Sequence, residues 1–113
     1  MQELSNGALT EAVYYILLTL KEPLHGYGIM QYVEKLSNGR VKLAAGTLYG
    51  AINSLLEKNW VKALSNSDDS RKKDYQITPL GLKALSQELL RLQELVENGL
   101  QIMKENGYEK DSL

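Results

Sequence analysis

The chain has 113 residues, 43% hydrophobic and 24% charged, which is the composition of a globular domain rather than of a disordered segment. The absence of cysteine excludes disulfides, thiolate zinc sites and cysteine nucleophiles, and the longest apolar run, from Ala12 to Leu20, is too short to cross a bilayer. The formal net charge of -1 does not identify a partner, and we expect a cytoplasmic protein.

Three amphipathic helices are predicted in the first half of the chain. Apolar residues recur at helical spacing within residues 8–21, 25–37 and 45–58. Asn38-Gly39 is a usual stop after the second helix, and the alternating residues 40–43 (RVKL) predict a very short strand before the third. The positions that define the helices are Leu9, Val13, Ile16, Leu17, Leu20, Ile29, Val33, Leu36, Leu48, Ile52, Leu55 and Leu56.

A hairpin and a long helix are predicted to follow. Two short strands within residues 60–78 are joined by the turn-rich segment SNSDDSRKKD, and Thr78-Pro79 supplies a hydroxyl cap and a first-turn proline. Beyond them a heptad seam runs along one helix face at Leu82, Leu85, Leu89, Leu92 and Val96. A second copy of the chain would cover this seam; packing on the chain's own domain is the alternative.

This order of elements predicts an α+β, mainly α fold. Residues 1–79 form a winged helix-turn-helix domain, which presents its third helix to a DNA major groove and its hairpin to the flanking backbone. Residues 80–113 form a C-terminal dimerisation helix and a short tail. A protein-interaction module that uses the same fold without specific DNA binding is the alternative.

The charges are unevenly distributed along the chain. Between residues 40 and 73, three acidic residues accompany seven basic ones, namely Arg40, Lys42, Lys58, Lys62, Arg71, Lys72 and Lys73. After residue 80 the balance reverses, with four basic and six acidic residues. The basic region is suited to face phosphate groups, and an ordinary solvated surface is the alternative interpretation.

Nothing in the sequence indicates catalysis. His25 is the only histidine, and the chain has neither a glycine-rich phosphate-binding loop nor a cluster of metal-ligating residues. We therefore expect no enzymatic activity, no metal and no cofactor.

Three segments carry a resemblance to a known family: PLHGYGI (23–29), AAGTLYGAINSLLEKNWV (44–61) and RKKDYQITPLG (71–81). In this order and spacing they resemble the PadR family of bacterial transcriptional regulators, in its compact subfamily with a single C-terminal helix. The resemblance implies a repressor that binds a pseudo-palindromic operator in double-stranded DNA as a homodimer. The sequence also departs from the family pattern at three places. Ala44-Ala45 stands where the family commonly has Ser-Pro, Gly50 stands in place of a frequent proline, and Ser54 stands near the position of a basic residue.

The DNA-binding residues that we expect from these segments lie in three places. They are Tyr27 at the start of the second helix, then Gly46, Thr47, Tyr49, Gly50, Asn53 and Ser54 on the third helix, and Arg71, Lys72 and Lys73 in the wing. For Tyr49, simple packing is the alternative. The third helix carries no charge as far as Leu56, so we expect the wing to supply most of the attraction and this helix most of the base selection.

The dimer interface is expected at Leu82, Leu85, Leu89, Leu92, Val96 and Met103. Drug-sensing members of the compact subfamily stack planar ligands on a tryptophan of the last helix, and this chain has no tryptophan after Trp60. Tyr14 and Tyr15, with Met103, could instead line a different apolar cavity that binds a small hydrophobic ligand at the dimer interface. The sequence does not identify this ligand.

Overall fold

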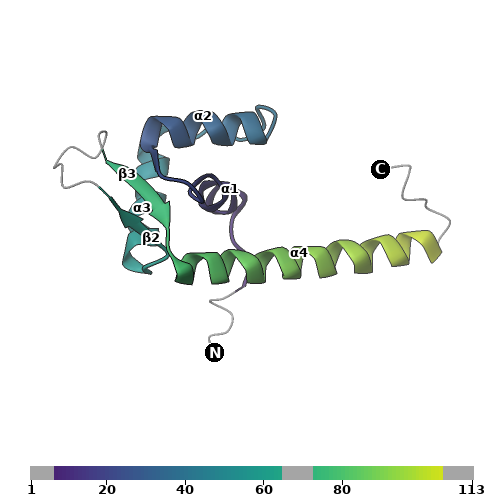
Figure 1. The fold of residues 1–113 in the computed structure, drawn as a ribbon. Coiled ribbons are helices and arrows are strands. Elements are labelled where there is room, and N and C mark those ends of the chain that lie inside the picture. The colour runs from purple at the N-terminus through teal and green to yellow at the C-terminus, as the bar shows by residue number, and fades with distance from the viewer. Residues whose placement is uncertain (1–6, 65–72, 106–113) are drawn as a thin grey trace.

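A small three-helix domain with a three-stranded sheet carries one long helix that extends away from it (Figure 1). The computed structural model describes residues 7–64 and 73–105. In chain order the elements are α1 (Glu11–Thr19), β1 (Leu24–His25), α2 (Gly26–Leu36), α3 (Ala45–Glu57), β2 (Val61–Ala63), β3 (Asp74–Ile77) and α4 (Pro79–Glu105). The predicted winged helix fold with a long C-terminal helix is confirmed.

The sheet is antiparallel, with the strand order β1-β3-β2. Val61 faces Ile77 in the β2–β3 hairpin, and Leu24 faces Tyr75 across the β1–β3 pair. The prediction of a strand at residues 40–43 is wrong. Residues 41–44 lie outside any strand, and Leu24–His25, within the turn after α1, takes the free edge of β3 instead. Alternation over four residues cannot show which segment finds a pairing partner, because pairing is a tertiary property.

The core gathers one face of each helix and the inner side of the sheet. Its members are Ile16, Leu17, Leu20, Ile29, Val33, Leu48, Ile52, Leu55, Val61, Tyr75, Ile77 and Leu85. Trp60 packs against this core but is only half-buried, and the Lys58 ammonium lies 4.9 Å from its ring centroid. Most buried positions on α1, α2 and α3 are those that the helical spacing selected, but the spacing missed Thr19 and Gly26, and Leu36, which it selected, is 41% exposed.

The start of α4 is fixed tightly to the sheet. Thr78 caps the helix, because its Oγ1 accepts a hydrogen bond of 3.0 Å from the Gly81 N–H. A Cβ at Gly81 would lie 2.2 Å from the Trp60 carbonyl oxygen, so only glycine lets the helix backbone come this close to the residue before β2. The direction in which α4 leaves the domain is therefore set by contact between two backbones.

A buried carboxylate joins α4 to the segment before α1. Glu88 is 5% exposed; its Oε1 accepts a hydrogen bond of 2.7 Å from Arg91 Nε, and its Oε2 accepts from Arg91 Nη2 at 2.6 Å and from the Leu9 N–H at 3.2 Å. These hydrogen bonds, those from Arg91 first, hold the pKa of Glu88 below its ordinary value against the opposing effect of burial.

Beyond this junction α4 continues for about 20 Å, at the usual helical rise of about 1.5 Å per residue. It lies apart from the other elements there (Figure 1). Among the described residues, no helix is long and apolar enough to cross a membrane.

Candidate nucleic-acid interface

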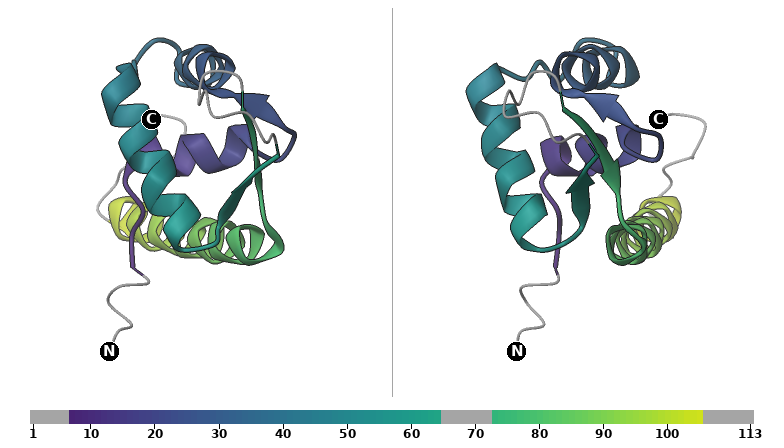
Figure 2. Two further views of the ribbon diagram at one scale, coloured as in Figure 1. Left: turned by 90° about the vertical axis from the view of Figure 1, so that its left-hand side faces the viewer. Right: turned by 60° about the vertical axis from the view of Figure 1, so that its left-hand side comes forward.

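The outer face of α3 is open to solvent. In the left panel of Figure 2 this helix crosses in front of α1, with the β2–β3 hairpin beside it. Leu48, Ile52 and Leu55 are buried on its inner side. The positions on its outer side, Gly46, Thr47, Gly50, Asn53 and Ser54, are all exposed. The structure therefore brings five of the six expected α3 residues to one surface.

From Gly46 to Ser54 this surface carries no charged side chain. A Cβ at Gly46 or at Gly50 would find no heavy atom within 4 Å, so both backbone positions are directly accessible. Thr47, Asn53 and Ser54 surround them with hydroxyl and amide groups, which donate and accept hydrogen bonds. Such a helix can come close to the edges of base pairs, and an asparagine amide has the geometry for bidentate contact with adenine.

The start of α3 lacks a side-chain cap. Its N-cap residue is Ala44, which has extended backbone geometry and makes no capping hydrogen bond through its side chain. Gly46 and Thr47 in the first turn are exposed. Because the first N–H groups of a helix have no partner within the helix, this end can accept an anion such as a phosphate.

Tyr49 differs from the other expected residues on α3. Its side chain is half-buried and lies over Gly26 at the start of α2, where a Cβ would be 2.1 Å from the Tyr49 hydroxyl oxygen. It also adjoins the buried Tyr75, whose pKa is raised by burial first and by Tyr49 second. The structure thus gives Tyr49 a packing role between α3, α2 and β3, and contact with DNA remains a prediction.

Tyr27 and Lys73 both lie at the start of α2. Tyr27, in the first turn of α2, is 62% exposed. Lys73 is half-buried and comes directly before Asp74, which pairs with His25 at the start of this helix. Lys73 is therefore placed near Tyr27, whereas Arg71 and Lys72 lie outside the described residues.

Two of the other basic residues in this region are engaged within the chain. Arg40 forms an ion pair with Glu11, and Lys58 lies over the Trp60 ring. Lys42 and Lys62 are exposed. Within residues 7–64 and 73–105, no group of three or more histidine or acidic residues could hold a metal ion.

Comparison with known proteins identifies the family. The model of the transcriptional regulator PadR-like family matches residues 13–87, from α1 into the first half of α4. The chain belongs to this family.

Solved structures of PadR-like proteins share the fold. A PadR family transcriptional regulator from Eggerthella lenta DSM 2243 superposes with a TM-score of 0.68 at 23% identity, covering 96% of this chain and 88% of that one. A PadR-like transcription factor from Bacteroides fragilis gives a TM-score of 0.65 at 26% identity, covering 88% and 94%. As a PadR-like protein the chain is a DNA-binding transcriptional regulator and not an enzyme, which confirms the prediction at this level.

A relative of known sequence is longer than this chain. It is an uncharacterised 37.1 kDa protein in the transposon Tn4556 of Streptomyces fradiae, 35% identical over 79 residues. The match covers 69% of this PadR-like chain and 22% of that protein's length.

The long helix of the PadR-like chain carries most of the expected dimer residues on its surface. Leu82 is 39% exposed, Leu89 and Met103 are also exposed, Val96 is 58% exposed, and Leu92 is half-buried. The prediction for Leu85 must be corrected. It is 4% exposed and belongs to the chain's own core, so it does not face a second chain. Heptad spacing cannot distinguish burial in the chain's own core from burial against a second chain. The first turns of α4 pack on the chain's own domain, and the later turns extend beyond it.

A groove follows the junction of α1 and α4. It has a volume of about 630 Å³ and is lined by Tyr14, Leu89, Leu92, Gln93, Val96, Glu97 and Leu100. Tyr14 meets Tyr15 edge to face at 5.9 Å between ring centroids. Tyr14 lines this groove, whereas Tyr15 and Met103 do not.

Sequence reasoning missed two residues that shape the interface. Gly26 makes room for Tyr49, and the repeated glycines of HGYG are a signal for such a close approach. Glu11 binds Arg40 across 29 positions of sequence, and no local pattern could have indicated that partner.

Proposed function

We propose that this PadR-like regulator is a repressor that binds a pseudo-palindromic DNA operator as a homodimer in the cytoplasm. The open outer face of α3, which is uncharged from Gly46 to Ser54, is the observation that carries the proposal. Gly46 and Gly50 allow the helix backbone to approach the floor of the major groove. Thr47, Asn53 and Ser54 then contact base edges, and the uncapped start of α3 meets a phosphate.

The wing supplies the electrostatic attraction in this proposal. Arg71, Lys72 and Lys73 contact backbone phosphates, and Tyr27 donates its hydroxyl to a phosphate beside them. Each neutralised phosphate adds about 0.9 to the slope of log affinity against log salt concentration, independently of base sequence. Base selection is thereby left to α3.

The exposed part of α4 supports the homodimer. Leu82, Leu89, Val96 and Met103 would remain in water in a monomer, and the groove beside Tyr14 can take a helix of the partner. A dimer that places two α3 helices about 34 Å apart reads half-sites in successive major grooves. A small hydrophobic ligand bound at this interface, near Tyr14 and Tyr15, would change that separation and release the operator.

A fluorescence anisotropy titration tests the proposal. The full chain is titrated against the promoter of its own operon and against a scrambled duplex, at two salt concentrations. We expect binding that is specific, weakened by salt and saturated at one dimer per site. An absence of binding at low salt would favour the protein-interaction module, and a monomer in a sizing run would exclude the dimer.

The wing is tested by replacing Arg71, Lys72 and Lys73 together with alanine. Three contacts in each of two subunits make six, so the salt slope of the dimer should fall by about five units. An unchanged slope would remove the wing from the interface.

A further inference from the structure

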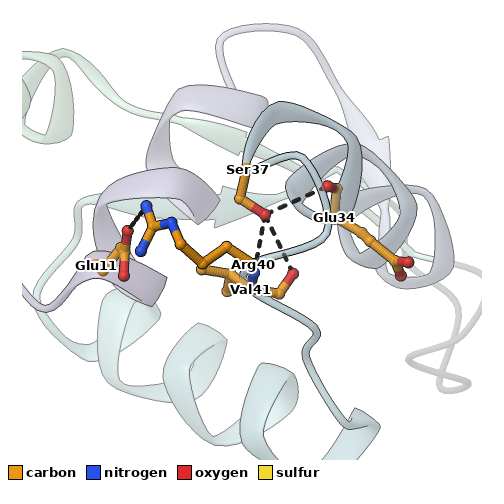
Figure 3. Close-up of polar contacts among 5 residues, drawn as sticks. All are labelled: Glu11, Glu34, Ser37, Arg40 and Val41. Carbon is orange, nitrogen blue, oxygen red and sulfur yellow. Dashed lines mark hydrogen bonds and ion pairs between the residues drawn. The ribbon is translucent and has the colours of Figure 1, made fainter.

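The turn between α2 and α3 is firmly fixed to the end of α2. Asn38 and Gly39 adopt positive φ angles of 55° and 82°, and the Gly39 N–H donates to the Glu34 carbonyl at 2.8 Å. The Ser37 hydroxyl accepts a hydrogen bond of 2.9 Å from the Val41 N–H and donates to the Glu34 carbonyl at 3.3 Å (Figure 3). The chain is therefore well held as far as Val41.

The segment that follows is held by side-chain packing, because Val41 and Leu43 lie against the core. Residues 41–44 form neither helix nor strand, and they lead directly into the first turn of α3, which lacks a side-chain cap. The tilt of the recognition helix is set by the side chains that hold this segment to the domain. One of these side chains anchors the start of the segment.

Arg40 is that anchor. Its guanidinium reaches across to the carboxylate of Glu11, the first residue of α1 (Figure 3). Glu11 stands on a fixed support, because Thr10 caps α1 through a 3.1 Å hydrogen bond from the Val13 N–H and the helix packs into the core. A carboxylate in the first turn of a helix is also favoured by the helix dipole.

Exposure limits what this pair contributes to folding. The Arg40 and Glu11 side chains are 62% and 46% exposed, and ion pairs at such sites add little to the free energy of unfolding. The position of the pair is therefore more informative than its strength. The pair connects α1, which packs against α4, to the segment that leads into α3.

We propose that Glu11 is a positioning residue for the recognition helix, which acts by holding Arg40 and the following segment 41–44 against α1. The proposal rests on the DNA-binding role of α3 described above. Glu11 and Tyr15 also line a cavity of about 300 Å³ between α1 and α4. The hydrogen bond and charge of Glu11, with a smaller contribution from Tyr15, raise the pKa of Arg40. A partner helix or ligand at this cavity thus lies beside the restraint on α3.

A simpler role for Arg40 makes the opposite prediction. If Arg40 served only as a phosphate contact, Glu11 would compete with the DNA for it. Removal of the Glu11 charge would then strengthen binding to every duplex. Under our proposal the same change loosens α3 and weakens binding to the operator alone.

The experiment compares Glu11→Gln with Glu34→Gln by anisotropy, against the operator and a scrambled duplex. Both variants remove one negative charge, and in Figure 3 the Glu34 carboxylate points away from Arg40. We expect Glu11→Gln to lose about fivefold in operator affinity relative to Glu34→Gln. Scrambled-duplex affinity and the thermal unfolding midpoint should match in the two variants, which a general loss of stability would not allow.

The exchange of the two charges completes the test. A double variant, Glu11→Arg with Arg40→Glu, should recover operator affinity to within about twofold of the wild type if the pair acts by position. Operator affinity that is unchanged or raised in Glu11→Gln, or a double variant that stays weak, would overturn the inference. If the wild-type chain does not distinguish operator from scrambled DNA, the proposed function itself fails.

Discussion

Replacement of Gly50 by alanine should move stability and DNA binding in opposite directions. Gly50 lies in the interior of α3, is exposed, and has no heavy atom within 4 Å of an added Cβ. Alanine is favoured over glycine inside a helix by about 0.8–1 kcal/mol. For a domain of this size such a gain corresponds to a rise of roughly 4 °C in the thermal unfolding midpoint.

The same methyl group would stand between α3 and the bases in the proposed complex. A misfit costs about 1 kcal/mol or more at each half-site, and a dimer has two half-sites. We therefore expect Gly50→Ala to bind the operator at least tenfold more weakly, with little change toward scrambled DNA. Scanning calorimetry and anisotropy on the same preparation measure both effects.

Two results would refute this reasoning. A stabilised variant with unchanged operator affinity would show that the middle of α3 does not approach DNA. A destabilised variant would show that the α3 surface at Gly50 does not accept a methyl group. Only the combination of higher stability and weaker operator binding agrees with the interface described above.

Three further substitutions test other parts of the structure. Gly81→Ala should lower the free energy of unfolding by about 1–3 kcal/mol in urea titrations, because its Cβ would overlap the backbone before β2; a gain in stability would contradict the close approach. Val96→Asp should convert the dimer to a monomer in sizing runs and lower operator affinity, whereas Gln101→Asp, on another side of α4, should remain dimeric. Glu88→Gln should cost about 1 kcal/mol at pH 7, since it removes a carboxylate held by Arg91. Because the folded-state pKa of Glu88 is lowered, its contribution is complete above the ordinary glutamate pKa and is lost as the pH falls through the depressed value. The difference between wild type and Glu88→Gln should therefore shrink in urea titrations at pH 3.5, and a constant difference would argue against an ionised Glu88.

The helices were predictable because their determinants are local. Apolar spacing selected the buried faces of α1, α2 and α3, and Thr78 caps α4 as its hydroxyl and the following proline indicated. Asn38 and Gly39 adopt the positive φ angles that a helix stop of this kind requires.

Features that depend on distant contacts were not predictable in the same way. The edge strand at Leu24–His25 forms because β3 offers a free edge, and two residues are too few to show a strand pattern in the sequence. Leu85 follows the heptad spacing yet packs into the chain's own core, since the first turns of α4 lie against β3 and α1. Arg40 counted as a basic residue in the sequence, but its ion pair with Glu11 exists only in the fold.

The close contact at Gly81 has a consequence for how operators of different length could be read. Since the start of α4 is held against the backbone at Trp60, the direction in which α4 leaves the sheet is fixed. In the proposed dimer, half-site spacing is then set by the point along α4 at which the two copies cross. A shift of that crossing by one heptad, about 10 Å, corresponds to about three base pairs at about 3.4 Å each. Substitutions far from the DNA could in this way change the preferred operator length without altering a single base contact.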